Sequence, residues 1–470
     1  MNGYDRRTDA ACPCLVARDS PYTAVRIVDL DLDEPDGLRA PGGTGPAEPD
    51  GRVLVLARLH GHPLGVVTVT CPPGDSAGLR QALVAAVHRE LTDAVDAHLA
   101  ADARALAGGV PADRRPAHGE PTEGEPTEDE PTGADAASVR PCRLSRARVL
   151  RDPPTISVVV ATRNRAPVLR QCLDSLLRTG YPRLEVLVVD NAPDDDSAET
   201  LVRDRYPGRV RYLREPVAGL ARAHNRALAE VTGRITAFTD DDTLVDRDWP
   251  AAIAESFAAS GRIGCVTGLI MPAELETRTQ ADLQRHGGYD KGFSPRTWSL
   301  ADPPGDPLFP FTAGRFGSGA NMAFRTGLLR EIGGFDPATG TGTAARGGDD
   351  LLGFFRTIVA GASLAYQPDA IVWHRPGRDP GALPAQAFGY GAGFGAFLAA
   401  AVANEPGMLP ALARRLPRGV HHAATRRRVA AAADSGWSRR LTLLEVQGML
   451  YGPLGYLRSL YRTHRITEGS

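Results

Sequence analysis

The sequence predicts an α/β fold with a mixed, mainly parallel sheet flanked by helices, and two observations carry this prediction. From Thr155 onward, short apolar runs alternate with amphipathic segments, which is typical of strands that alternate with helices. The apolar runs end in polar clusters, and the most acidic cluster is Asp240-Asp241-Asp242. Because the carboxyl ends of parallel strands meet at one edge of a sheet, we expect these clusters to line a common rim.

The elements of this sheet domain are expected in a regular order. Apolar runs predict strands at 156–160, 184–189, 210–213 and 234–239. Helical periodicity predicts helices at 167–177 and 218–231. The domain is expected to cover residues 151–378, with a helical C-terminal extension at 379–470.

Three segments precede this domain. Residues 1–20 are expected to be a tail, and residues 21–107 a small α+β unit of unknown role. This unit should contain strands at 52–59 and 64–69, joined by a turn, and one helix at 77–107. Residues 108–150 are predicted to be a linker, because repeated Glu-Pro-Thr and clustered acids cannot bury enough apolar surface to fold. The arginines of 140–151 either meet this acidic stretch or are solvated.

Composition excludes several classes of protein. The chain is 42% hydrophobic and 23% charged with a net charge of −2, which fits a globular protein without general attraction to nucleic acid. Its 6 cysteines show no CxxC pair or paired His motif, so neither a zinc site nor a disulfide framework is expected, and the cytoplasm is the default location. No secretory signal is expected at the N-terminus. Residues 382–403 are uncharged, but Pro384, Gln386 and several glycines favour a buried or surface helix over a membrane span.

The polar clusters at the predicted rim are the candidates for chemistry. In chain order they are Thr162-Arg163-Asn164-Arg165, Asp190-Asn191, His224-Asn225 and Asp240-Asp241-Asp242. Carboxylates at the first and third positions of the last cluster suit Mg²⁺ or Mn²⁺, with phosphate oxygens completing the shell. Taken alone, the same cluster is equally compatible with an acidic turn that caps a helix.

This order of motifs resembles the family 2 glycosyltransferases, which are inverting enzymes of the GT-A fold that use nucleotide-sugar donors. The resemblance covers roughly residues 155–375, and several motifs in the family's order are more specific than any one of them. The segments that carry it are 157–165, 188–191, 238–242, 317–324, 332–336, 347–350 and 368–374. Two positions depart from the family pattern: Asp349 replaces the usual Glu, and His224 stands where a basic residue is common, so Arg222 is a second candidate for diphosphate binding.

The resemblance implies a role for each rim residue. Asp240, Asp242 and His374 would hold the divalent cation, Mn²⁺ or Mg²⁺. Asp350, or its neighbour Asp349, would be the general base that removes a proton from the acceptor hydroxyl. The residues expected to bind the nucleotide-sugar are Thr162, Arg163, Arg165, Asp190, His224, Asn225, Asp241, Gly319 and Asn321. Taken singly, Asp190 and Asp349-Asp350 could be helix caps, and His374 an ordinary strand-end histidine.

The expected function is therefore metal-dependent, inverting transfer of a sugar to the hydroxyl of a saccharide, lipid-linked or small-molecule acceptor in the cytoplasm. The apolar segment from 382 and the arginines beyond 414 either make a peripheral contact with the inner face of the membrane or form a solvated basic face. One alternative is a nucleotidyltransferase, although 162–165 lacks a glycine-rich phosphate-binding signature. The other is a non-catalytic sugar- or nucleotide-binding protein of the same fold.

Overall fold

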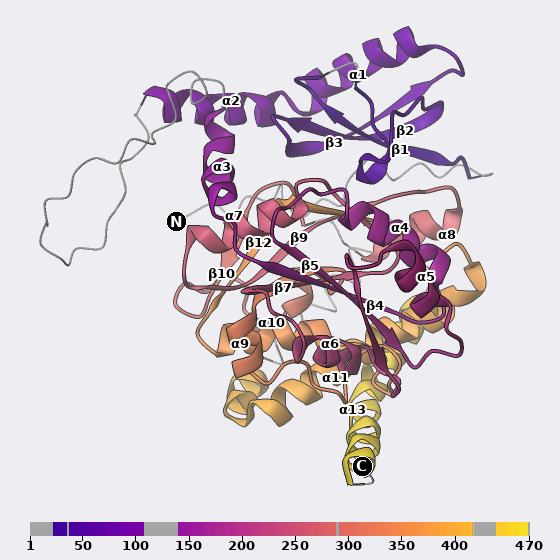
Figure 1. Ribbon diagram of the computed structural model, residues 1–470, viewed down its shortest axis with the longest axis vertical. Helices are drawn as coiled ribbons and strands as arrows, with labels where there is room; N and C mark the ends of the chain where they lie inside the picture. The colour runs from indigo at the N-terminus through magenta and orange to yellow at the C-terminus, as the bar shows by residue number, and fades with distance from the viewer. Residues whose placement is uncertain are drawn as a thin grey trace, which may run out of the picture.

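The apolar runs of the sequence form two sheets, which are seen in a computed structural model that describes residues 22–34, 37–107, 140–287, 291–415, 417 and 439–468. The small N-terminal unit and the C-terminal helix lie at opposite ends of the long axis (Figure 1). The predicted tail at 1–20 and residues 108–139 of the predicted linker lie outside the described residues.

The main sheet has nine strands and is mostly parallel, which confirms the predicted fold class. Its path runs β10-β12-β9-β11-β7-β4-β5-β6, and β8 pairs with β12. Strands β7, β4, β5 and β6 are parallel neighbours, whereas β11 runs antiparallel to β7 and β9. The bounds are β4 Ile156–Thr162, β5 Leu184–Asn191, β6 Arg211–Glu215, β7 Ile235–Asp240, β8 Thr243–Val245, β9 Ile263–Pro272, β10 Arg296–Trp298, β11 Asn321–Arg325 and β12 Ser363–His374.

Helices cover both faces of this sheet because the strand residues alternate between two cores. Val158 and Val160 pack into one core with α4 and α7, while Val159 packs into the other with α6 and α10. The predicted helices at 167–177 and 218–231 are observed as α4 and α6. The bounds are α4 Ala166–Leu176, α5 Ser197–Arg205, α6 Leu220–Leu228, α7 Trp249–Ala259, α8 Arg278–Gly287, α9 Thr326–Glu331 and α10 Asp349–Val359.

The N-terminal unit is a three-stranded sheet of β1 Val25–Asp31, β2 Gly51–Leu59 and β3 His62–Cys71. The predicted β2–β3 hairpin is confirmed, and its turn residues His60 and Gly61 both have positive φ, as a tight two-residue hairpin turn requires. The parallel strand β1 was not predicted. Arg26 and Asp29 interrupt its apolar pattern, and Asp29 is buried through an ion pair with Arg58 of β2.

The predicted single helix at 77–107 is wrong, because the structure has two helices there. They are α1 Ser76–Glu90 and α2 Thr92–Ala107, and the backbone leaves the helical region at Leu91. The Leu91 side chain is 8% exposed and packs against β3, where Gly65 leaves room for it. Burial of this leucine turns the chain away from the small sheet even though the apolar repeat continues.

Both faces of the small sheet are covered. One face packs on α1, while the other contributes Ile27, Leu54 and Leu56 to a core shared with the main sheet. On the main sheet this shared core includes Leu269 of β9 and Trp373 of β12. The continuous apolar run of β2 follows from this burial on two sides.

Part of the predicted linker is a helix, α3 Leu144–Arg151, which follows the short 3₁₀ turn η4 Pro141–Arg143. Arg146 of α3 is buried and pairs with Glu255 at 3.0 Å and Asp369 at 2.5 Å. At this position the basic cluster is therefore not solvated, because carboxylates of the main domain hold the Arg146 guanidinium.

The C-terminal extension contains two long helices, α11 Leu383–Asn404 and α13 Arg439–Glu468, which pack against each other at glycines. A Cβ added at Gly391 would lie 1.8 Å from the Glu445 carbonyl oxygen, and one at Gly448 would lie 2.1 Å from that of Phe388. Within the described residues, Pro380–Asn404 is long and apolar enough to cross a membrane, but half of its most apolar window is buried in the protein.

Candidate active site

The ends of three neighbouring strands place the predicted polar residues on one rim. In the parallel register, Thr162 of β4 lies opposite Asp190 of β5, and Ala161 lies opposite Asp240 of β7. The apolar residues before these positions are buried in the two cores, so each chain segment is fixed up to the point where its polar side chain begins. The sequence therefore positions these groups by burying the strands that carry them.

His374 reaches the aspartate cluster through a strand pairing that the sequence did not predict. Strand β8 follows the cluster directly and pairs with β12, so that Thr243 lies opposite His374. His374 Nε2 is 3.6 Å from Asp242 Oδ1, and the Arg375 backbone N–H donates to the Asp242 carbonyl at 3.1 Å. Burial lowers the pKa of His374, which favours the neutral imidazole that can bind a metal.

The Asp349-Asp350 pair lies at the same rim. Gly348 precedes α10 with a left-handed φ of 89°, which starts the helix so that both carboxylates lie in its first turn. The Gly319 N–H donates to Asp350 Oδ2 at 2.9 Å, and the Leu351 N–H donates to Oδ1 at 2.8 Å. These two bonds fix the orientation of the Asp350 carboxylate.

The rim concentrates negative charge. Burial raises the pKa of Asp240 well above its usual range, and the charges of Asp242, Asp241, Asp349 and Asp350 raise it further. Burial and the charge of Asp350 raise the pKa of Asp349 to about 7. The strand pairing agrees with this effect, because Asn321 of β11 lies opposite Thr239 of β7, so that Gly319 and its partner Asp350 lie near the end of β7.

Arg165 offsets part of this charge. Its guanidinium lies 2.8 Å from Asp241 Oδ1 and 2.9 Å from Asp242 Oδ2. Asp241 is buried and also accepts a hydrogen bond from the Thr162 hydroxyl at 2.7 Å. Asp241 and Thr162 therefore join the ends of β7 and β4, and the predicted role of Asp241 in donor binding stays a prediction.

The residues present fit a divalent cation. Asp242 Oδ1 is buried and has no hydrogen-bond partner among the described residues, although His374 lies beside it. Carboxylate oxygens with one imidazole are a donor set that Mn²⁺ and Mg²⁺ accept. The excess of acidic groups over Arg165 supplies the charge that such a cation would balance.

One of the two carboxylate oxygens of Asp190 has no hydrogen-bond partner among the described residues. It is 1% exposed and accepts a hydrogen bond from the Tyr212 hydroxyl at 3.0 Å on Oδ2. Its Oδ1 is buried without a hydrogen-bond partner in the described part of the chain. Tyr212, on β6, was not predicted, and only its place on the next strand after β5 could have indicated it.

Arg163, another residue that the sequence predicts to bind the donor, lies exposed on the loop after β4.

Three predicted donor-binding side chains have interior partners instead. Asn321 is 1% exposed, donates to the carbonyls of Leu269 and Ala370, and accepts from Trp249 Nε1. The Asn225 side chain donates to the Phe335 carbonyl at 2.6 Å and accepts from the Phe335 N–H at 2.9 Å. Both amides hold strands and loops together, so these hydrogen bonds give the two side chains a structural role, while their predicted contact with the nucleotide stays a prediction.

His224 is the third of these side chains, and its Nδ1 lies 3.8 Å from Asp349 Oδ2. Its ring is 3% exposed and lies between Phe238 and Phe335, with centroid distances of 4.7 and 5.0 Å. Burial lowers its pKa to about 3, so it carries no positive charge for a diphosphate. The alternative, Arg222, is half-buried and donates to the Thr463 hydroxyl of α13 at 3.1 Å.

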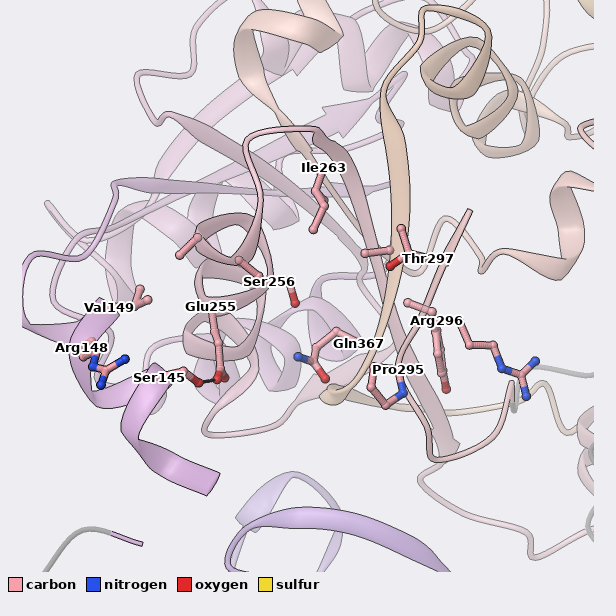
Figure 2. Close-up of a pocket in the computed structure, with 14 residues that line it drawn as sticks. Ser145, Arg148, Val149, Glu255, Ser256, Ile263, Pro295, Arg296, Thr297 and Gln367 are labelled. Atoms are coloured by element: carbon pink, nitrogen blue, oxygen red, sulfur yellow. Dashed lines mark hydrogen bonds between the residues drawn. The ribbon is translucent and has the colours of Figure 1, made fainter. Parts of the chain in front are cut away.

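A cavity of about 460 Å³ lies elsewhere, between α3, α7 and the sheet edge formed by β10 and β12. Figure 2 shows Glu255, Arg296 and Gln367 around it, and none of the rim carboxylates lines it. It borders the start of β12, whereas His374 ends that strand. The cavity is therefore separate from the candidate site.

Parts of this chain are similar to known glycosyltransferases. Residues 157–333 match the family model described as Glycosyl transferase family 2. The pre-mycofactocin glycosyltransferase of Mycobacterium tuberculosis is 28% identical over 223 residues, which cover 47% of this chain and 42% of that protein. The poly-beta-1,6-N-acetyl-D-glucosamine synthase of Staphylococcus epidermidis is 26% identical over 114 residues, covering 24% of this chain and 28% of the synthase. The chain thus spans less than half the length of these curated relatives.

Two solved structures are also similar. A mannosyltransferase from Pyrobaculum calidifontis in complex with GDP-Man and Mn²⁺ is 23% identical with a TM-score of 0.41, covering 66% of this chain and 92% of that one. GalNAc-T7 with UDP, GalNAc and Mn²⁺ is 17% identical with a TM-score of 0.37, covering 48% of this chain and 44% of that one.

Proposed function

We propose that this protein, whose residues 157–333 match the model of glycosyl transferase family 2, is a metal-dependent inverting glycosyltransferase of that family. It would move a sugar from a nucleotide-sugar donor to the hydroxyl of an acceptor. The observation that supports this most is the convergence of Asp242 and His374, 3.6 Å apart, with the Asp349-Asp350 pair that acts electrostatically on Asp240. A cation site, a base and a nucleotide-facing carboxylate then share one rim.

Asp240, Asp242 and His374 would hold the cation. When bound, Mn²⁺ or Mg²⁺ neutralises the diphosphate that leaves the sugar. Arg165 now pairs with Asp241 and Asp242, and it could turn its guanidinium to a phosphate once the cation compensates these carboxylates. Asp190 would accept a hydrogen bond from the base at Oδ1, with Thr162 and Arg163 bordering the nucleoside.

Asp350 would be the general base. It takes the proton of the acceptor hydroxyl, and the oxygen's electron pair forms the new bond to the anomeric carbon as the bond to the diphosphate oxygen breaks. Attack on the face opposite the leaving group inverts the configuration. Burial raises the pKa of Asp350, which strengthens it as a base, while the N–H groups of Gly319 and Leu351 hold its orientation.

Release of nucleoside diphosphate tests this function. Purified protein is incubated with UDP-, GDP- and dTDP-sugars, a panel of saccharide, lipid-linked and small-molecule acceptors, and Mn²⁺, Mg²⁺ or chelator. We expect cation-dependent release that falls at least about 100-fold in Asp350→Asn and in Asp242→Ala. The control is Asp174→Asn, a partly exposed carboxylate that pairs with Arg205 on the helix surface.

Each rival function has its own outcome. Release of pyrophosphate in place of nucleoside diphosphate would indicate a nucleotidyltransferase. Saturable binding of nucleoside diphosphates without turnover of any donor would indicate a binding protein. Turnover that is unchanged by chelator and by Asp242→Ala would contradict the metal-dependent mechanism.

We also propose that α13 rests on an anionic membrane surface at the inner face of the membrane, with the catalytic domain in the cytoplasm. Its exposed apolar side chains recur at helical spacing and form one stripe. They are Leu443, Leu450, Leu454, Leu457 and Tyr461, between 47% and 78% exposed. Exposed arginines of the same helix, including Arg458, Arg462 and Arg465, would meet anionic headgroups.

Vesicle flotation tests this contact. The protein should float with vesicles that contain phosphatidylserine but not with neutral vesicles, and the double variant Leu450→Glu, Leu457→Glu should stay in solution. Leu300→Glu, at an exposed leucine outside the stripe, is the control. A stripe that instead joins two copies of the chain would give a dimer in sedimentation that the double variant dissociates, without flotation, and would contradict the membrane contact.

A further inference from the structure

Four side chains of metal-ligating type meet where the N-terminal unit joins the main domain. His60 comes from the β2–β3 turn, His98 and Asp102 lie one turn apart on α2, and Cys142 lies in η4. Their ligand atoms all lie within 4.8 Å of one another. Sequence spacing gave no hint of this cluster, because its members lie in three separate segments and form no short motif.

The distances within the cluster are close to those of tetrahedral coordination. His60 Nδ1 is 3.1 Å from His98 Nε2, 3.2 Å from Asp102 Oδ2 and 3.4 Å from Cys142 Sγ. His98 Nε2 is 3.9 Å from Asp102 Oδ2. Zinc bonds of 2.0–2.3 Å in a tetrahedron place ligand atoms about 3.3–3.8 Å apart. A small movement of the four ligand atoms toward or away from their common centre would therefore accommodate one ion.

Hydrogen bonding alone accounts poorly for this arrangement. An imidazole nitrogen offers one proton or one lone pair, yet His60 Nδ1 faces three partner atoms within 3.4 Å. Asp102 is 8% exposed, and its Oδ2 has no hydrogen-bond partner of suitable geometry within the described ranges. The Asp102 carboxylate therefore depends on contacts with His60 and Cys142 for its compensation, and a shared cation would satisfy it together with the other three atoms.

We propose that His60, His98, Asp102 and Cys142 form a structural site for Zn²⁺. Two imidazoles, one thiolate and one carboxylate are ligands that zinc prefers, and four protein ligands leave no position open for a substrate. His60 Nε2 lies 3.6 Å from Asp33 Oδ2, the arrangement in which a carboxylate orients a ligating histidine. The proposal differs from the expectation from sequence that the cysteines take part in no zinc site.

The site would fasten the two units of the protein to each other. His98 and Asp102 precede residues 108–139, while Cys142 follows them and leads directly into α3. Arg143, next to Cys142, donates to the His60 carbonyl at 2.6 Å, and Arg146 of α3 is held by carboxylates of the main domain. One ion would thus connect the small sheet, α2 and the entry to the main domain, which is a structural role.

Metal analysis of untagged full-length protein tests the site. Because the rim carboxylates could also bind zinc, the background is Asp242→Ala. We expect about one zinc per chain after dialysis, falling below about a tenth in Cys142→Ala and in His98→Ala within that background. His88→Ala, an exposed histidine on α1, is the matched control and should retain the ion. In Co²⁺-substituted protein, a thiolate-to-cobalt absorption band should be present and should vanish in Cys142→Ala.

Folding controls and metal content together decide whether this zinc site exists. Circular dichroism and the thermal midpoint report whether a variant is folded. In the Asp242→Ala background, chelation should lower the midpoint, with recovery on adding Zn²⁺ but not Mn²⁺. Zinc that disappears with Asp242→Ala alone would belong to the rim and would overturn the proposal. Dialysed protein without zinc, or zinc retained by folded Cys142→Ala and His98→Ala variants, would overturn it as well.

Discussion

Replacing Asn321 by leucine separates a structural role of this residue from the nucleotide contact expected from sequence. The side chain bridges three elements from β11: it donates to the carbonyls of Leu269 in β9 and Ala370 in β12, and it accepts from Trp249 Nε1 of α7. Leucine has a similar volume but no polar atoms. The change therefore removes three hydrogen bonds without creating a large cavity.

The loss of stability in Asn321→Leu follows from the buried polar groups that lose their hydrogen-bond partner. Each buried donor or acceptor that loses its partner costs about 1–3 kcal/mol, so three of them set a range of about 3–9 kcal/mol. Contacts within one network are not additive, which places our expectation near the lower end, at about 4 kcal/mol. Trp249→Phe removes one of the three hydrogen bonds and should cost about 1–3 kcal/mol.

Urea unfolding gives the free energy of unfolding, and calorimetric titration of the folded protein gives the affinity for a nucleoside diphosphate. We expect the large loss of stability with affinity changed less than about threefold, and a double-mutant cycle with Trp249→Phe should show coupling of about 0.5–3 kcal/mol. A stability loss below about 1 kcal/mol together with a tenfold loss of affinity would refute the structural role.

Three further predictions concern packing and charge. Gly391→Ala should lower the thermal midpoint by several degrees because its Cβ meets the carbonyl of α13, whereas Gly389→Ala, with nothing within 4 Å, should not. His224, with its pKa lowered to about 3, is neutral when folded and takes up a proton on unfolding below about pH 6.5, so its contribution is lost as the pH falls. Urea titrations should show the wild type losing about 2 kcal/mol more than His224→Leu between pH 7.5 and pH 5; equal losses would contradict the buried neutral ring. Arg58→Met leaves two buried carboxylates without their counter-ion and should cost about 3–5 kcal/mol in urea unfolding, while a neutral result would contradict their ionised state.

The strands β4, β5, β6 and β7 of the main domain could be located in the sequence because burial dictates their composition. Val158, Val159 and Val160 face two cores, so the run is apolar throughout and stops abruptly where the rim begins. The small strand β1 could not be found this way. Its charged residue Asp29 is buried only because Arg58 of the neighbouring strand compensates it.

The rim was predictable in part for the same reason. Asp190 and Asp240 follow apolar runs, so their position at strand ends can be inferred from local sequence. Asn321 and His224 look equally polar in sequence, and only the tertiary contacts with Trp249 and Phe335 show that they face inward. A one-dimensional pattern cannot distinguish a polar group aimed at solvent from one with a buried partner.

The shared core beneath the small sheet means that residues 22–107 cannot be treated as a removable appendage. Deleting them would expose Leu269 and Trp373 to water and strip Asp246, just after β8, of its partner Arg58. Strands β8 and β12 bring the aspartate cluster and His374 toward each other, so such a truncation would weaken the strand pairing that holds the candidate site together. A shortened version made for expression, or a chimera that takes over the main domain, should therefore keep the small sheet.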